Sequence, residues 1–196
     1  MKILPEILES TETITQIRRN IHAHPELRFE EKRTAELVAE ALSSWGIPVF
    51  NGLGKTGVVG RIDGELGPGK MIGLRADMDA LPIQEGTQLP WASVKPGLMH
   101  ACGHDGHTAM LLAAAKRLAQ DCNFDGTLNL IFQPAEEGGG GALKMMADGL
   151  FTRFPCDMIF AAHNMPGMTT GQLVFRNGPA MASSDYATVT LTGRGG

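Results

Sequence analysis

The segment richest in reactive side chains covers residues 99–107, which read MHACGHDGH and contain three histidines, one cysteine and one aspartate. Thiolate and imidazole groups are good ligands for zinc and similar divalent ions. Because crowded polar side chains need partners, and a metal ion supplies them, the segment predicts a metal site that includes Cys102 and His104. The alternative is a solvated loop in which the cluster is accidental.

Two adjacent glutamates form the second reactive segment. Glu136 and Glu137 stand in the sequence QPAEEGGGG, after an apolar run and at the start of a glycine-rich stretch. Neighbouring side chains point in different directions, so one carboxylate can bind a metal while the other takes a proton from a water molecule. A solvated acidic turn is the alternative, since paired glutamates are common on protein surfaces.

Two further apolar runs end in polar side chains. His163 follows a run that begins at Met158, and Asp77 and Asp79 follow a run that ends at Leu74. Taken alone, the histidine is more typical of a hydrogen-bonded place in the core than of a metal ligand. The aspartates are equally typical of local hydrogen bonds in a loop.

The elements that must position these residues follow from the spacing of apolar side chains. Helical spacing is found in residues 5–22, 30–45, 108–120 and 142–150. Short apolar runs typical of strands occupy residues 57–62, 71–74, 127–132 and 157–162. Strands and helices alternate, which predicts an α/β fold with a mainly parallel sheet flanked by helices.

The reactive groups share a position relative to these strands. Each acidic or histidine group lies at the carboxyl end of a predicted strand or in the loop that follows it. In open α/β sheets this edge is where ligands bind. The sequence therefore predicts one metal site at the edge, but this argument does not name a substrate.

The last part of the chain has a different pattern. Residues 172–175 and 186–192 are typical of strands, with no helix between them, and the second run alternates polar and apolar side chains. We therefore expect a second domain to begin near Ser183. Because the final strand has no visible partner, we also expect the protein to continue beyond residue 196.

Composition excludes several classes of function. The net charge is -4 and no run of lysines and arginines is present, which argues against nucleic-acid binding. No apolar stretch has the length of a membrane span, and residues 1–20 lack the apolar core of a secretory signal. The three cysteines form no C-x-x-C pair, which favours a reducing, cytoplasmic location.

The motifs together match a known pattern, and the chain resembles the amidohydrolase branch of the M20 metallopeptidase family. This branch includes hippurate hydrolases, N-acyl-amino-acid amidohydrolases and auxin-conjugate hydrolases. The motifs occur in the expected order over nearly the whole chain: Arg18 and Arg19, then HAHPEL at 22–27, GLRADMDALP at 73–82, MHACGHDGH at 99–107, QPAEEGGGGA at 133–142 and AHNMPG at 162–167.

The resemblance implies a centre of two divalent metal ions. Its ligands would be Cys102, His104, Glu137 and His163, with Cys102 shared by both ions, and Glu136 would be the general acid and base. The thiolate favours zinc and the carboxylates suit manganese, while cobalt or nickel would also fit. A further histidine ligand that the family places near its C-terminus has no counterpart in these 196 residues.

The resemblance also implies a domain plan. Residues 1–182 would form an incomplete catalytic domain of the zinc-exopeptidase type, and residues 183–196 would begin a ferredoxin-like lid and dimerisation domain. We expect hydrolysis of small N-acyl amino acids, without nucleic-acid or membrane partners, by a protein that forms at least a homodimer at full length. A dipeptidase or aminopeptidase is one alternative, and a catalytically silent metal-binding fragment is another.

Other polar residues of the motifs receive smaller roles. We interpret Asp77 and Asp79 as residues that orient metal ligands, and His22 and His24 as local capping and packing residues. Asp105 could orient His104 or cap the following helix, and His107 is not assigned as a ligand.

Overall fold

The computed structural model describes residues 4–183 and 187–195, which divide between two units. The unit formed by residues 2–164 contains all the helices and strands of the described chain, and the unit formed by residues 165–196 contains none. The predicted boundary between residues 182 and 183 remains a prediction.

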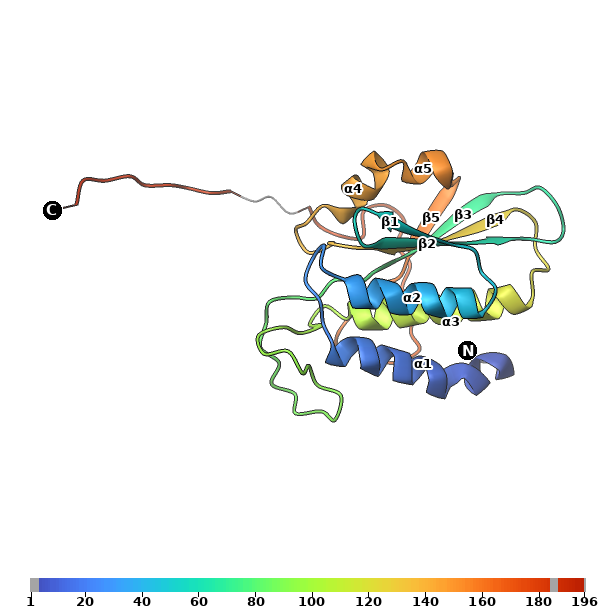
Figure 1. Ribbon diagram of the computed structural model, residues 1–196, viewed down its shortest axis with the longest axis horizontal. Helices are drawn as coiled ribbons and strands as arrows, with labels where there is room; N and C mark the ends of the chain where they lie inside the picture. The colour runs from blue at the N-terminus through green and yellow to red at the C-terminus, as the bar shows by residue number, and fades with distance from the viewer. Residues whose placement is uncertain (1–3, 184–186, 196) are drawn as a thin grey trace. The chain divides into compact units, whose positions relative to one another are not determined.

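A five-stranded sheet forms the centre of the first unit (Figure 1). Its strands are β1 (Val49–Leu53), β2 (Gly57–Asp63), β3 (Met71–Asp77), β4 (Thr127–Gln133) and β5 (Met158–Ala161), in the order β1-β2-β4-β3-β5. The strand β3 is parallel to both β4 and β5, whereas β2 is antiparallel to both β1 and β4.

The predicted α/β fold is confirmed, but the sheet is mixed rather than mainly parallel. No helix separates β1, β2 and β3 in the chain, and their connections are short. A parallel neighbour requires a crossover of about a dozen residues or more, so these short connections reverse the direction of the chain.

Helices cover both faces of the sheet. On one face lie α2 (Lys32–Ser44) and α3 (His104–Gln120), with α1 (Pro5–Ala23) packed on the outer side of α3. On the other face lie α4 (Gly141–Ala147) and α5 (Leu150–Arg153) (Figure 1). The main core lies between the sheet and the first pair of helices, where Val38, Leu42, Leu112, Leu130 and Phe132 are fully buried.

Three elements differ from the sequence prediction. The strand β1 was not predicted because it contains Asn51 and Gly52, which are poor strand formers, and its pairing with β2 is irregular there. The helix α3 begins at His104 instead of near Thr108. The predicted helix at 142–150 is divided into α4 and α5 at Gly149, which has a φ angle of 89°.

The strands predicted in the last part of the chain are not observed. Residues 172–175 and the described residues of 186–192 are irregular and exposed, and Tyr186 lies outside the described residues. A strand depends on a partner that satisfies its backbone groups, and neither segment pairs with another strand in the described part of the chain.

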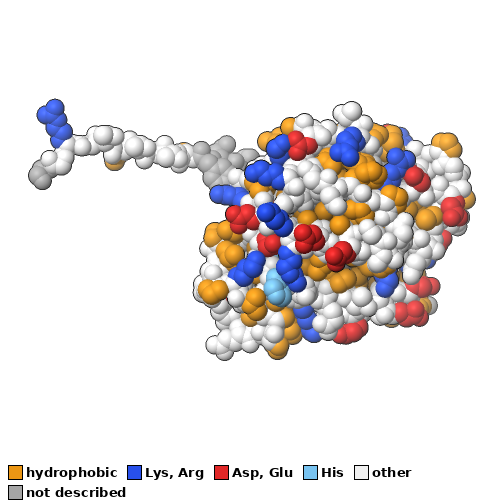
Figure 2. All heavy atoms as spheres, in the orientation of Figure 1, with side chains coloured by type: hydrophobic (Ala, Val, Ile, Leu, Met, Phe, Trp, Pro, Cys, Tyr) orange, Lys and Arg blue, Asp and Glu red, His pale blue; other side chains and the backbone are white. Residues whose placement is uncertain are grey.

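The surface of the first unit carries charges of both signs. On the face drawn in Figure 2, lysine and arginine side chains are interspersed with aspartate and glutamate side chains. None of the helices in the described residues combines the length and apolar character needed to cross a membrane.

Candidate metal centre

The three mutually parallel strands bring their carboxyl ends to one edge of the sheet. Asp77 is the last residue of β3, the two glutamates lie in the loop after β4, and His163 follows the end of β5. Cys102 and His104 reach the same place from the start of α3 and the loop before it. The arrangement agrees with the edge predicted from the sequence.

His104 stands at the centre of this group. Its side chain is fully buried, and Nδ1 lies 3.2 Å from Asp79 Oδ1. Its Nε2 is buried without a hydrogen-bond partner among the described residues. This nitrogen lies 3.5 Å from Asp77 Oδ2 and 4.0 Å from an oxygen of each glutamate, Glu136 and Glu137.

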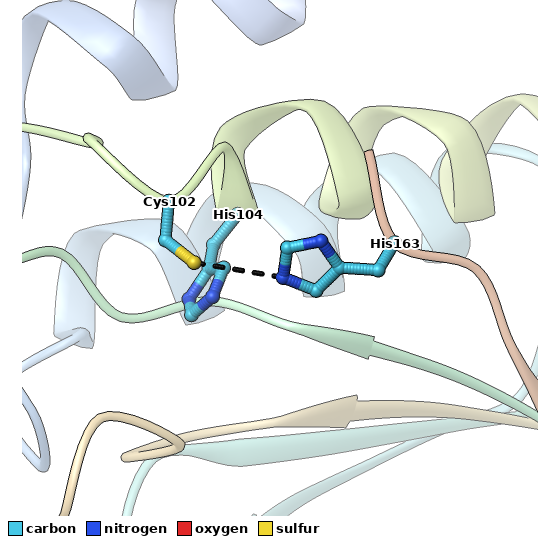
Figure 3. Close-up of side chains that lie close together, drawn as sticks. All are labelled: Cys102, His104 and His163. Atoms are coloured by element: carbon cyan, nitrogen blue, oxygen red, sulfur yellow. Dashed lines mark hydrogen bonds between the residues drawn. The ribbon is translucent and has the colours of Figure 1, made fainter. Parts of the chain in front are cut away.

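Cys102 and His163 lie on the open side of His104. Figure 3 shows both side chains directed toward each other, with the ring of His104 beside them. The distance between Cys102 Sγ and His163 Nε2 is 3.5 Å. One potential ligand atom from each of these three residues lies within 4.8 Å of the others, and the same holds for His104 with Glu136 and Glu137. The five predicted site residues are therefore brought together.

The two glutamates are held by a structured loop. The backbone N–H of Glu137 donates to Asp79 Oδ2 at 2.9 Å, and Arg28 donates to the carbonyl oxygen of Glu137 at 3.1 Å. The Glu136 side chain is 44% exposed and that of Glu137 is 27% exposed. Asp79 thus holds both His104 and the glutamate loop, which supports its predicted orienting role.

Asp77 and His107 form a buried pair beside His104. Nδ1 of His107 lies 2.6 Å from Asp77 Oδ1, and Nε2 of His107 accepts the backbone N–H of Asn164 at 3.1 Å. Burial alone would raise the pKa of Asp77, but the hydrogen bond with His107 and the charge of Arg75 lower it to about 2. His107 was not assigned to the site from sequence, although its spacing of three residues from His104 on a helix was a usable signal.

The charges around Cys102 favour its thiol form when no cation is present. Burial and the neighbouring Glu137 raise the pKa of Cys102 to about 12. Burial would lower the pKa of His104, but the hydrogen bond to Asp79 and the nearby carboxylates raise it. The nearby carboxylates act in the same direction on both groups, whereas burial raises the pKa of Cys102 and opposes the rise at His104.

The predicted roles of Asp105, His22 and His24 are only partly observed. Within the described residues Asp105 makes no side-chain hydrogen bond to His104; its Oδ2 atom accepts from Arg18 and pairs with His22. It also makes no capping hydrogen bond at the start of α3. His24 does bond locally, to the backbone oxygen of Asn20, whereas His22 is buried between two carboxylates.

The residues of the site fit a divalent cation. A thiol, two imidazoles and several carboxylates converge, and the free Nε2 of His104 is aimed into the group they form. With Nδ1 of His104 facing Asp79, the lone pair of Nε2 is available to a metal. A buried nitrogen without a partner is costly, so its position favours an occupied site.

The family model described as peptidase family M20/M25/M40 matches residues 73–194. The chain belongs to this family. It is 53% identical to hippurate hydrolase of Campylobacter jejuni, over 100% of this chain and 51% of that protein. It is 43% identical to N-acyl-L-amino acid amidohydrolase of Geobacillus stearothermophilus, over 91% of this chain and 48% of that protein.

A solved structure of the M20 family gives the same fold. The YXEP protein of Bacillus subtilis, described as a dinuclear metal binding peptidase, is 42% identical and superposes with a TM-score of 0.77. The match covers 82% of this chain and 45% of that one. The chain thus spans about half the length of the M20 relatives it matches.

Proposed function

We propose that the protein is a metal-dependent amidohydrolase that cleaves the amide bond of small N-acyl amino acids. The observation that carries this proposal is the free, buried Nε2 of His104 at the meeting point of Cys102 and two glutamates. The relatives named for hippurate and N-acyl-L-amino acid hydrolysis support the substrate class.

The proposed centre holds two divalent ions, Zn²⁺ or Mn²⁺, with Co²⁺ or Ni²⁺ as further candidates. Its ligands are Cys102, His104, Glu137 and His163, whose potential ligand atoms converge around His104. When bound, the ions polarise the scissile carbonyl group and make the attacking water more acidic. The description of YXEP as a dinuclear metal binding protein supports the number of ions.

Glu136 is the proposed general base. It is the more exposed of the two glutamates, so its carboxylate can face both water and substrate. Glu136 accepts a proton from the attacking water while the oxygen of that water bonds to the carbonyl carbon. As the carbon–nitrogen bond breaks, Glu136 passes the proton to the leaving amine, which yields a carboxylic acid and an amino acid.

The role of Glu136 predicts a separation of turnover from metal binding. In the full-length protein, Glu136→Gln should lower kcat by at least about 10²-fold, because only the proton shuttle is removed. Binding of Co²⁺ should remain close to that of the unchanged protein. The exposed Glu65→Gln variant is the control and should retain full activity. Near-normal turnover by Glu136→Gln would overturn the assignment.

A peptidase of the same family is the second candidate, because the similar YXEP protein is described as a peptidase. Comparing hippurate with a free dipeptide as substrates separates the two candidates. Faster turnover of the N-acyl amino acid supports the amidohydrolase, and faster turnover of the dipeptide supports the peptidase.

The hypothesis of a catalytically silent fragment is tested by comparing proteins of different chain length. Activity with added Mn²⁺ or Zn²⁺ should be compared between the present 196 residues and a longer form of the protein. Hydrolysis by the 196-residue chain would exclude the hypothesis that it is catalytically silent. The homodimer, the cytoplasmic location and the absence of nucleic-acid and membrane partners remain predictions from sequence.

A further inference from the structure

A charged cluster of three buried side chains and one half-exposed arginine adjoins the candidate metal centre through Asp105, which follows His104 in the chain. It consists of Arg18 and His22 from α1, Glu85 from the connection between β3 and α3, and Asp105 from the first turn of α3. The side chains of His22, Glu85 and Asp105 are 7%, 3% and 1% exposed. None of the four is a proposed ligand or the proposed base, so the mechanism gives the cluster no role.

His22 holds the cluster together through both of its ring nitrogens. Nδ1 lies 3.0 Å from Asp105 Oδ2, and Nε2 lies 3.2 Å from Glu85 Oε1. Carboxylate oxygens only accept hydrogen bonds, so both nitrogens donate and the ring carries a positive charge. Arg18 donates from Nε to the same Asp105 oxygen at 3.1 Å, which leaves two positive groups facing two negative groups.

The two partners of His22 belong to the two segments that carry Cys102 and His104, two of the four candidate ligands. Asp105 is adjacent to His104 in the chain and sits in the same first turn of α3. Glu85 lies within residues 78–103, a connection that carries Asp79 near one end and Cys102 near the other.

Glu85 also forms hydrogen bonds with other residues of the same connection. Glu85 Oε2 accepts the backbone N–H of Ser93 at 2.6 Å, and Glu85 Oε1 accepts the hydroxyl of Thr87. The backbone N–H of Val94 also donates to the carbonyl oxygen of Ala23, next to His22, at 2.9 Å. A long connection without regular structure needs such anchors to hold a fixed shape.

We propose that His22 is a positioning residue of the metal centre. Its two hydrogen bonds fix the first turn of α3 against the connection 78–103, and so hold His104 and Cys102 at the spacing that one metal ion requires. This inference rests on the metal centre of the proposed function. The alternative is that the cluster stabilises the whole fold and has no specific effect on metal binding.

Cobalt binding separates the two views. We would titrate the metal-free protein with Co²⁺ and follow the visible bands and the near-ultraviolet thiolate band. His22→Ala should weaken Co²⁺ affinity by about tenfold or more, as changes to residues that orient metal ligands do. His22→Asn should recover only part of the affinity, because its amide nitrogen can donate to Asp105 in place of Nδ1 but leaves Glu85 without its His22 partner.

A variant that is destabilised at a site remote from the candidate ligands supplies the control. Val38→Ala removes buried atoms from α2, a helix that carries no candidate ligand, and should lower the thermal midpoint without changing Co²⁺ affinity. The proposal is overturned if His22→Ala binds Co²⁺ as tightly as the unchanged protein, or if Val38→Ala weakens binding equally. If the unchanged protein itself gives no thiolate–cobalt band, the proposed metal centre fails, and that result is distinct from a failure confined to His22.

Discussion

At the scale of single residues, the chemistry of the site depends on which nitrogen of His104 is free. Asp79 faces Nδ1, which leaves Nε2 directed toward Cys102 and the glutamates. Residue types and their places after strands predicted a metal site at this edge of the sheet, and the family resemblance implied the roles of its five central residues, which remain predictions. The partners of Asp105 could not be predicted, because His22 lies 83 positions away in the chain and local patterns do not encode such a distant pairing.

Replacing Asp79 should weaken metal binding without removing a ligand. In Asp79→Asn, an amide group must serve both the His104 ring and the Glu137 N–H, and one of the two contacts is lost or weakened. We expect Co²⁺ affinity to fall by about 10- to 100-fold in a competition titration. Asp63→Asn, an exposed carboxylate outside the site, should leave the affinity unchanged. An equal loss in both variants would contradict the role of Asp79.

The charge of His22 should make stability depend on pH. Its hydrogen bond with Asp105 raises its pKa above the ordinary value of 6.5, in spite of the opposing effect of burial. A raised pKa means that the stabilisation is fully present below pH 6.5 and is lost as the pH rises through the pKa of the folded state.

Urea unfolding at about pH 6 and about pH 9 measures this effect. The unchanged protein should lose more stability over that interval than His22→Asn, whose amide does not titrate. An identical pH dependence in the two proteins would contradict a charged His22.

At the scale of elements, the site depends on three parallel strands and on the loop after β4. The positions of β3, β4 and β5 could be predicted because they are short, apolar and bounded by turn residues. The strand β1 could not, since its stability comes from pairing with β2 and not from its own residues. The strand β2 was predicted at residues 57–62, but its antiparallel direction was not, because strand direction is a property of the pairing.

We expect a side chain at Gly141, which follows the loop after β4, to disturb both stability and metal binding. A Cβ atom there would lie 1.7 Å from the carbonyl oxygen of Pro134, so the segment that carries both glutamates must move. Gly141→Ala should lower the free energy of unfolding by about 1–3 kcal/mol and also weaken Co²⁺ binding. Gly86→Ala, where an added Cβ meets nothing within 4 Å, is the control and should affect neither quantity.

At the scale of the whole molecule, the sheet ends beside the candidate site in an exposed apolar strand. The strand β5 is the edge of the sheet on the side of His163, and Met158, Ile159 and Phe160 are all at least 45% exposed. An apolar edge of this kind is typical of a surface that another segment or chain covers. The sequence predicted the class of fold, and the five site residues that it named lie together at one edge of the sheet. It named no residues for an acyl pocket, and the chain spans 51% of the length of the hippurate hydrolase.

The most direct test of the metal centre uses the three cysteines. Co²⁺ added to the metal-free protein should produce a thiolate–cobalt band in the near ultraviolet, and Cys102→Ser should abolish it. Cys122→Ser and Cys156→Ser should retain the band, because these residues lie outside the group that surrounds His104. A band that persists in Cys102→Ser, or no band in the unchanged protein, would contradict the metal centre proposed for this chain.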